Sequence, residues 1–84
     1  GSVTLGTIYV DKGAAKALLV RKSLLTIGIK KAEGKFSEGE VVQIMDEEGT
    51  IIGVAKTKLD VHAIGNQLLI KNIIAAHADD IVLF

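Results

Sequence analysis

The sequence predicts a small, mainly β domain with a barrel-like arrangement of about five to seven short strands and one principal helix near the N-terminus. Short runs rich in Ile and Val alternate with turns marked by Gly. Only residues 12–21 have both a good N-cap and apolar residues at helical spacing. The 84 residues include two Phe, one Tyr and no Trp, so residues 3–84 are expected to form a single domain with an aliphatic core. Gly1 and Ser2 are interpreted as the remnant of a cleaved tag.

The first elements are a strand and the helix. Residues 7–10 form a β-prone run, and Asp11 then provides a side chain suited to cap a helix. Ala14, Ala17 and Leu18 fall near one face of the segment that follows, which predicts a helix over residues 12–20. Arg21 and Lys22 come in its last turn or just past it, where cations interact favourably with the helix dipole.

A tight turn, with a 3₁₀ turn as one form of it, is expected over residues 23–25. Residues 27–32 alternate in part and predict a strand. Gly28 within this segment indicates a bend or a close approach of another part of the backbone. Glu33-Gly34 then predicts a turn.

A hairpin is predicted in the middle of the chain, after a second turn at residues 37–40. Residues 41–45 and 51–55 are two β-prone runs joined by an acidic loop at residues 46–49, which ends in Gly.

The last third is harder to assign. Asp60 is expected to cap a short helical turn over residues 60–64, which Gly65 would end. Residues 68–76 are apolar and ambiguous between strand and helix, and a strand is preferred. Residues 80–84 predict a final strand.

The composition argues against several kinds of site. The chain has no Cys, so it has no disulfide and no thiolate site. Its two His residues lack metal-ligand spacing, and no catalytic triad or phosphate-binding glycine loop is present. Neither a catalytic residue, a metal site nor a cofactor is expected. A membrane span is not expected either, because no apolar run approaches the required ~18 residues.

The formal net charge is zero, but the charges are not evenly spread. Residues 11–35 carry seven basic and two acidic residues, whereas residues 36–48 carry five acidic and no basic ones. A neutral total therefore combines a basic first third with an acidic middle.

Several motifs together resemble the PUA domain. They are Val10-Asp11-Lys12-Gly13-Ala14, Ser23-Leu24-Leu25 followed by Gly28-Ile29, Gly34-Lys35-Phe36 followed by Gly39-Glu40-Val41, and Asp46-Glu47-Glu48-Gly49. The terminal segment His77-Ala78-Asp79-Asp80-Ile81-Val82 is similar to the end of the PUA domains found at the C-terminus of bacterial glutamate 5-kinases. Three departures from the family pattern are present: Thr26 replaces the usual Pro, Ala78 replaces the usual Arg, and Lys56-Thr57-Lys58 lacks the Tyr often found after the preceding strand.

The resemblance implies a PUA-like pseudobarrel that binds structured RNA through the first helix, the turn after it and the neighbouring strand. The residues expected to contact phosphate are Lys16, Arg21, Lys22, Lys30 and Lys31, and the acidic loop at residues 46–48 is expected to lie away from the RNA. The equally weighted alternative is that these residues are solvated surface charges.

The absence of Cys favours a cytoplasmic location, because small secreted domains usually carry disulfides. The resemblance also implies a piece of a longer protein such as a glutamate 5-kinase, which phosphorylates L-glutamate with ATP in proline biosynthesis. In such a protein the domain would be a regulatory or assembly module that contacts its own catalytic domain. A PUA domain of an RNA-modifying enzyme is the remaining alternative.

Overall fold

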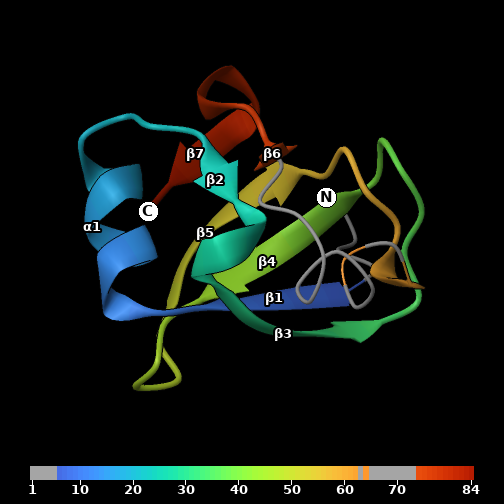
Figure 1. Cartoon of the computed structure of the whole chain (residues 1–84), viewed down its shortest axis with the longest axis horizontal. Coiled ribbons are helices and arrows are strands. Elements are labelled where there is room, and N and C mark those ends of the chain that lie inside the picture. Colours follow the sequence, from blue (N-terminus) through green and yellow to red (C-terminus); the bar gives the residue numbers. More distant parts are fainter. Residues whose placement is uncertain (1–5, 63, 65–73) are drawn as a thin grey trace.

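In the computed structural model, seven strands form two sheets in the described part of the chain, residues 6–62, 64 and 74–84 (Figure 1). The larger sheet has the strand order β3-β1-β4-β5-β7, and the smaller sheet pairs β2 with β6. The strands are β1 (Gly6–Val10), β2 (Leu24–Leu25), β3 (Ile29–Gly34), β4 (Val41–Met45), β5 (Ile51–Lys56), β6 (Ile74–Ala76) and β7 (Ile81–Leu83). The prediction of a mainly β fold is confirmed.

The first strand, β1, is an internal strand of the larger sheet and lies next to the edge strand β3. β1 pairs with β3 in an antiparallel arrangement and with β4 in a parallel one. β4 and β5 form the antiparallel hairpin that the sequence predicts, and β7 adds to the far side of β5. β3 and β7 are therefore the two edges of this sheet.

The helix α1 (Lys12–Leu19) begins where the sequence places its cap. The Asp11 carboxylate accepts a hydrogen bond from the Ala14 N–H at 2.7 Å, which satisfies one of the unpaired donors of the first turn. The Asp11 N–H donates to the Gly28 carbonyl at 2.9 Å, so the start of α1 is also tied to the chain beyond it. Leu18 is the buried residue of the helix.

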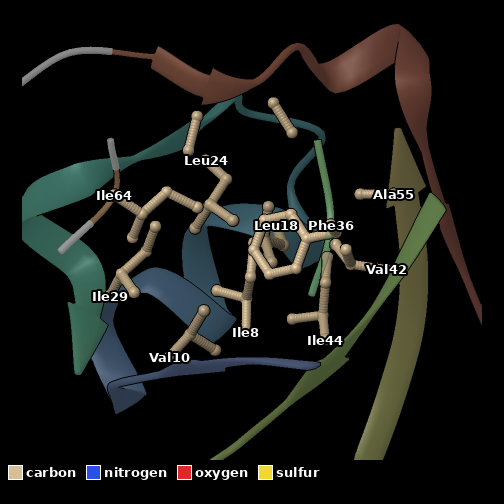
Figure 2. Close-up of a cluster of buried hydrophobic side chains, with 12 residues drawn as sticks. Ile8, Val10, Leu18, Leu24, Ile29, Phe36, Val42, Ile44, Ala55 and Ile64 are labelled. Carbon is tan, nitrogen blue, oxygen red and sulfur yellow. The ribbon is translucent and has the colours of Figure 1, made fainter. Parts of the chain in front are cut away.

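The core lies between the two sheets and α1. Alternate side chains of β1 and β4 point inward, as the pleat of a strand requires, so Ile8, Val10, Val42 and Ile44 are buried. Phe36 lies in the loop between β3 and β4, and Figure 2 shows its ring near the centre of the cluster. The aliphatic core expected from the composition is confirmed in the described residues.

The prediction of a tight turn at residues 23–25 is wrong. Leu24 and Leu25 form β2, and the 3₁₀ turn η1 (Thr26–Gly28) follows this strand. Leu24 is buried because it pairs with Ala76 of β6, a partner 52 residues further along the chain. The next strand consequently begins later than predicted, at Ile29, and continues to Gly34, which has the positive φ of 95° that favours glycine.

The C-terminal strand is also shorter than predicted. Residues Ala78–Asp80 form a second 3₁₀ turn, η2, in which the Asp80 N–H donates to the His77 carbonyl. Asp60 begins a helical segment as expected, since its carbonyl accepts from the Ile64 N–H at 3.0 Å. Of the strand preferred for residues 68–76, Ile74–Ala76 is confirmed, and residues 68–73, like Gly65, lie outside the described residues.

Candidate nucleic-acid interface

Two of the five predicted RNA-contacting residues lie at the C-terminal end of α1. The Arg21 N–H donates to the Leu18 carbonyl and the Lys22 N–H to the Ala17 carbonyl, each at 3.0 Å. These two bonds form the double-bonded reversal that commonly ends helices, and Arg21 takes its left-handed conformation with φ of 65°. The reversal turns the chain outward, and both side chains are exposed.

Arg21 and Lys22 line a cavity of about 230 Å³. Its other walls are the buried Leu18 of α1 and, from η2 and β7, Ala78, Ile81, Val82 and Leu83. Figure 1 shows this proximity, because the C-terminus lies beside α1. This alpha-end groove, as we call it, places two cations against a largely apolar wall.

The cations of the alpha-end groove are not neutralised by any ion pair among the described residues. Among residues 6–62, 64 and 74–84, the ion pairs are Lys30 with Glu47 and Lys31 with Glu33, and neither includes Arg21 or Lys22. Lys16, one turn earlier on α1, is likewise exposed and outside these pairs. Lys16, Arg21 and Lys22 therefore form a first basic group that is available to an anionic partner.

Lys30 and Lys31 form a second group at the start of β3, in a different chemical setting. The Lys30 ammonium lies 3.3 Å from the Glu47 carboxylate, and the Lys31 ammonium lies 2.9 Å from that of Glu33. Lys31 also lies over the Tyr9 ring, 4.6 Å from its centroid. Tyr9, Lys30 and Lys31 line a shallow cavity of about 420 Å³ together with Asp46, Glu47 and Gly49.

The pKa values of Lys31 and Glu33 are shifted by their ion pair. The pKa of Lys31 lies above its usual value because the ammonium donates a hydrogen bond to Glu33 and is attracted by its charge. The same hydrogen bond and charge hold the pKa of Glu33 below its usual value. Both groups are fully charged at neutral pH, and each cancels much of the field of the other.

The acidic loop, which the sequence analysis expects to lie away from the RNA, contacts one of the five basic residues directly, because Glu47 pairs with Lys30. β1 explains this contact, because Tyr9 pairs with Lys31 of β3 on one side and with Met45 of β4 on the other. The start of β3 and the end of β4 thus become neighbours across a single strand. The five residues form two separate groups, of which the first is free of acidic partners among the described residues.

Sequence reasoning missed the C-terminal wall of the alpha-end groove. Ala78, Ile81 and Leu83 are ordinary apolar residues, and only the resemblance of residues 77–82 to a family motif marks this segment. It also missed Lys56 and Lys58, which are exposed and line a cavity of about 380 Å³. That cavity includes the acidic residues Glu38 and Asp80, which lower its attraction for an anion.

Another side of α1 borders an apolar groove of about 300 Å³, between the helix and the β2–η1 segment. It is lined by Ala14 and Ala17 of the helix and by Leu24, Leu25 and Ile27, with Asp11 at one end. Helix, turn and neighbouring strand therefore do lie together, as the family resemblance implies, but no basic residue lines this side.

The described residues contain no group of three or more His, Asp or Glu side chains arranged to hold a metal ion. The acidic hairpin tip instead satisfies its own backbone, since the Asp46 carboxylate accepts from the Glu48 and Thr50 N–H groups at 2.9 Å. Within the same residues, no helix has the length and hydropathy needed to cross a membrane.

Comparison with known proteins identifies relatives of two kinds. Residues 6–67 match the family model of the PUA domain. Among curated proteins, the glutamate 5-kinase of Aquifex aeolicus is 51% identical over 51 residues, which are 61% of this chain and 14% of the relative. That of Streptococcus pneumoniae is 45% identical over 65 residues, or 75% of this chain and 18% of the relative. The chain thus spans less than a fifth of the length of these relatives.

Solved structures agree on the fold. A PUA domain of Aeropyrum pernix, in a complex with tartrate, superposes with a TM-score of 0.80 at 31% identity and covers 86% of this chain and 40% of its own. A chain from the structure of an H/ACA ribonucleoprotein bound to a substrate RNA superposes with a TM-score of 0.78 at 20% identity. The match covers 94% of this chain and 23% of that one, and shows that the two share the fold. The family match, which covers most of the chain, establishes that this protein belongs to the PUA domain family.

Proposed function

We propose that this domain is a non-catalytic RNA-binding module and that the alpha-end groove is its primary contact with RNA. The observation that carries the proposal is the presence of Arg21 and Lys22 beside a cavity, both outside the ion pairs of the described residues. Phosphate contacts require cations that are not already paired with carboxylates, because such cations can replace the counterions of the RNA phosphates. Lys16 extends the same basic group along α1.

Lys30 and Lys31 are secondary contacts in this proposal. Each would have to leave a carboxylate before it could bind a phosphate, so its net contribution to affinity is smaller. Recognition through phosphates and 2′-hydroxyls also suits a domain with only three aromatic residues, because structured RNA is recognised mainly by its shape.

The test is a titration of a fluorescently labelled hairpin RNA, at about 50 mM and about 200 mM salt, with the domain and with an Arg21→Ala/Lys22→Ala variant. We expect weak binding that falls with salt, and a slope of log K against log salt that is smaller by about 1–2 in the double variant. Glu48→Gln serves as a variant outside the groove that should not weaken binding. Absence of binding at low salt, or binding unaffected by the double change, would remove this function.

A second candidate function is supported by the curated relatives, which are glutamate 5-kinases at 45–51% identity. In this alternative the domain is part of a cytoplasmic kinase that phosphorylates L-glutamate with ATP for proline biosynthesis. The domain would contact the catalytic domain of the same protein and serve its regulation or assembly. A PUA domain of an RNA-modifying enzyme is the third possibility.

The gene distinguishes these parent proteins. An amino-acid-kinase region encoded upstream supports the kinase, and a region for an RNA-modifying enzyme supports the third possibility. The kinase assignment is compatible with RNA binding, so the titration above is required in either case.

A further inference from the structure

Arg21 occupies a backbone position that is unfavourable for an arginine. Its φ of 65° lies in the left-handed region, where a Cβ approaches the following carbonyl oxygen and glycine is preferred. The other described residues with positive φ are Gly34, Gly39 and Gly49, all glycines. The helix reversal at Arg21 is also the position at which helices most often carry Gly. The sequence therefore uses arginine where the backbone favours glycine.

No ion pair or hydrogen bond of the Arg21 side chain within the described residues compensates for this conformation. The Arg21 guanidinium takes part in no ion pair or hydrogen bond with another described residue. A favourable interaction with the helix dipole is available to the neighbouring Lys22 as well, so it does not by itself require arginine at position 21. Arg21 is, moreover, the only arginine in the chain. A residue kept in a strained conformation without a partner indicates a role for its side chain outside the fold.

The unpaired edge of β7 is a second, independent feature of the same groove. β7 is the edge of the sheet, and the Phe84 N–H donates to the Ile52 carbonyl of the neighbouring segment at 3.0 Å. Residues of an antiparallel pair alternate between hydrogen-bonded and non-hydrogen-bonded positions, so Leu83 is at a non-hydrogen-bonded position opposite Gly53. The N–H and carbonyl of Leu83 therefore point away from β5, on the side that has no strand partner in the described residues. Leu83 and Arg21 both line the alpha-end groove.

We propose that Arg21 and the Leu83 N–H together bind one phosphate group of the RNA, and that the strain at Arg21 is retained for this contact. This inference rests on the proposed function and deepens it, because it assigns the strongest phosphate contact to one residue. A guanidinium presents a planar fork of donors that matches two phosphate oxygens, and a backbone N–H adds a donor in a fixed direction. Leu18, Ile81 and Val82 form the apolar wall against which the adjoining nucleoside packs.

The decisive variant is Arg21→Gly, because it relieves the backbone while removing the guanidinium. We expect its melting temperature to rise by a few degrees and its affinity for the labelled hairpin RNA to fall by about tenfold. Lys22→Ala is the matched control, which loses an adjacent cation without changing a left-handed residue. It should weaken RNA binding less than Arg21→Gly and should not raise the melting temperature. Arg21→Lys should recover only part of the affinity, since an ammonium lacks the fork.

Backbone NMR gives a second measurement. The Leu83 amide resonance of the original protein should shift when RNA is added, and this shift should be lost in Arg21→Gly. A polyglutamate of equal charge tests whether any polyanion suffices, and we expect it to bind more weakly and to leave the Leu83 amide unmoved.

The inference is overturned by an Arg21→Gly variant that binds RNA as the original does, by one that is not stabilised, or by polyglutamate binding that depends equally on Arg21. If the original protein binds no RNA at all, the proposed function itself fails. The melting temperature of Arg21→Gly then still reports whether the conformation is strained.

Discussion

Gly28 lies so close to Ala14 that a Cβ added at position 28 would be 2.5 Å from the Cβ of Ala14. Gly28 belongs to η1 and Ala14 to the first turns of α1, so this contact sets how closely the helix lies against the chain after β2. The hydrogen bond from the Asp11 N–H to the Gly28 carbonyl holds the same two segments together. The absence of a side chain at Gly28 is therefore a packing requirement.

Gly28→Ala is expected to destabilise the domain by about 1–3 kcal/mol, since the new methyl group forces α1 away from η1. Urea denaturation followed by circular dichroism measures this change. Gly13→Ala is the matched control, because a Cβ at position 13 would meet its nearest neighbour, an Asp11 carboxylate oxygen, only at 3.4 Å. Ala14→Gly combined with Gly28→Ala should recover part of the lost stability. A single Gly28→Ala variant as stable as the original protein would contradict the packing argument.

Asp11→Ala is expected to reduce the free energy of unfolding by about 0.5–2 kcal/mol, because the Ala14 N–H loses its acceptor at the start of α1. The same denaturation experiment measures it. Asp11→Ser keeps an oxygen that can accept from the helix and should retain most of the stability. Equal losses in the two variants would show that capping is not the function of this side chain.

The Lys31–Glu33 pair predicts a pH dependence that can be measured at a single residue. The pKa of the Glu33 carboxyl should lie below its usual value by carbon-detected NMR, and in Lys31→Met it should return to the usual range. Because the folded pKa is lowered, the stabilisation from Glu33 is present above the usual carboxyl pKa and is lost as the pH falls through the lowered value. The raised pKa of Lys31 acts oppositely: its contribution is lost as the pH rises through that value. A Glu33 pKa that is unchanged by Lys31→Met would exclude this pairing in solution.

Glu47→Gln is expected to increase the affinity for the hairpin RNA by about two- to fivefold at low salt, because it releases Lys30 and removes a nearby negative charge. Glu48→Gln changes the net charge equally in the same loop but does not release Lys30, so it should have a smaller effect. The fluorescence titration compares the two. Equal increases would mean that net charge alone is responsible, and no increase would mean that Lys30 lies outside the RNA contact.

Local signals in the sequence were enough for the elements whose partners are near in the chain. The Asp11 cap, α1, the hairpin of β4 and β5, and the close approach at Gly28 all follow from residues that lie within a few positions of one another or from their periodicity. β2 could not be predicted in this way. It has two residues, and its pairing with β6 depends on a segment about 50 residues away.

The candidate site shows the same limit. Residue type and the family resemblance together placed Lys16, Arg21, Lys22, Lys30 and Lys31 in one basic face. Their separation into two groups depends on β1, which brings the acidic hairpin beside β3, and on the position of β7 beside the end of α1. Neither arrangement leaves a local pattern in the sequence. The left-handed conformation of Arg21 is equally hidden, because a glycine would have marked it and an arginine does not.

The position of β1 between β3 and β4 has a consequence for how the domain is assembled. β1 cannot pair with β3 until the chain through Gly34 has been synthesised, and it cannot pair with β4 until the chain through Met45 is available. A parallel contact between β1 and β4 closes a long loop, and such contacts slow folding relative to hairpins. We therefore expect β1 to remain exposed during synthesis, with its Ile8 and Val10 side chains accessible to chaperones, and the sheet to form in a single late cooperative step.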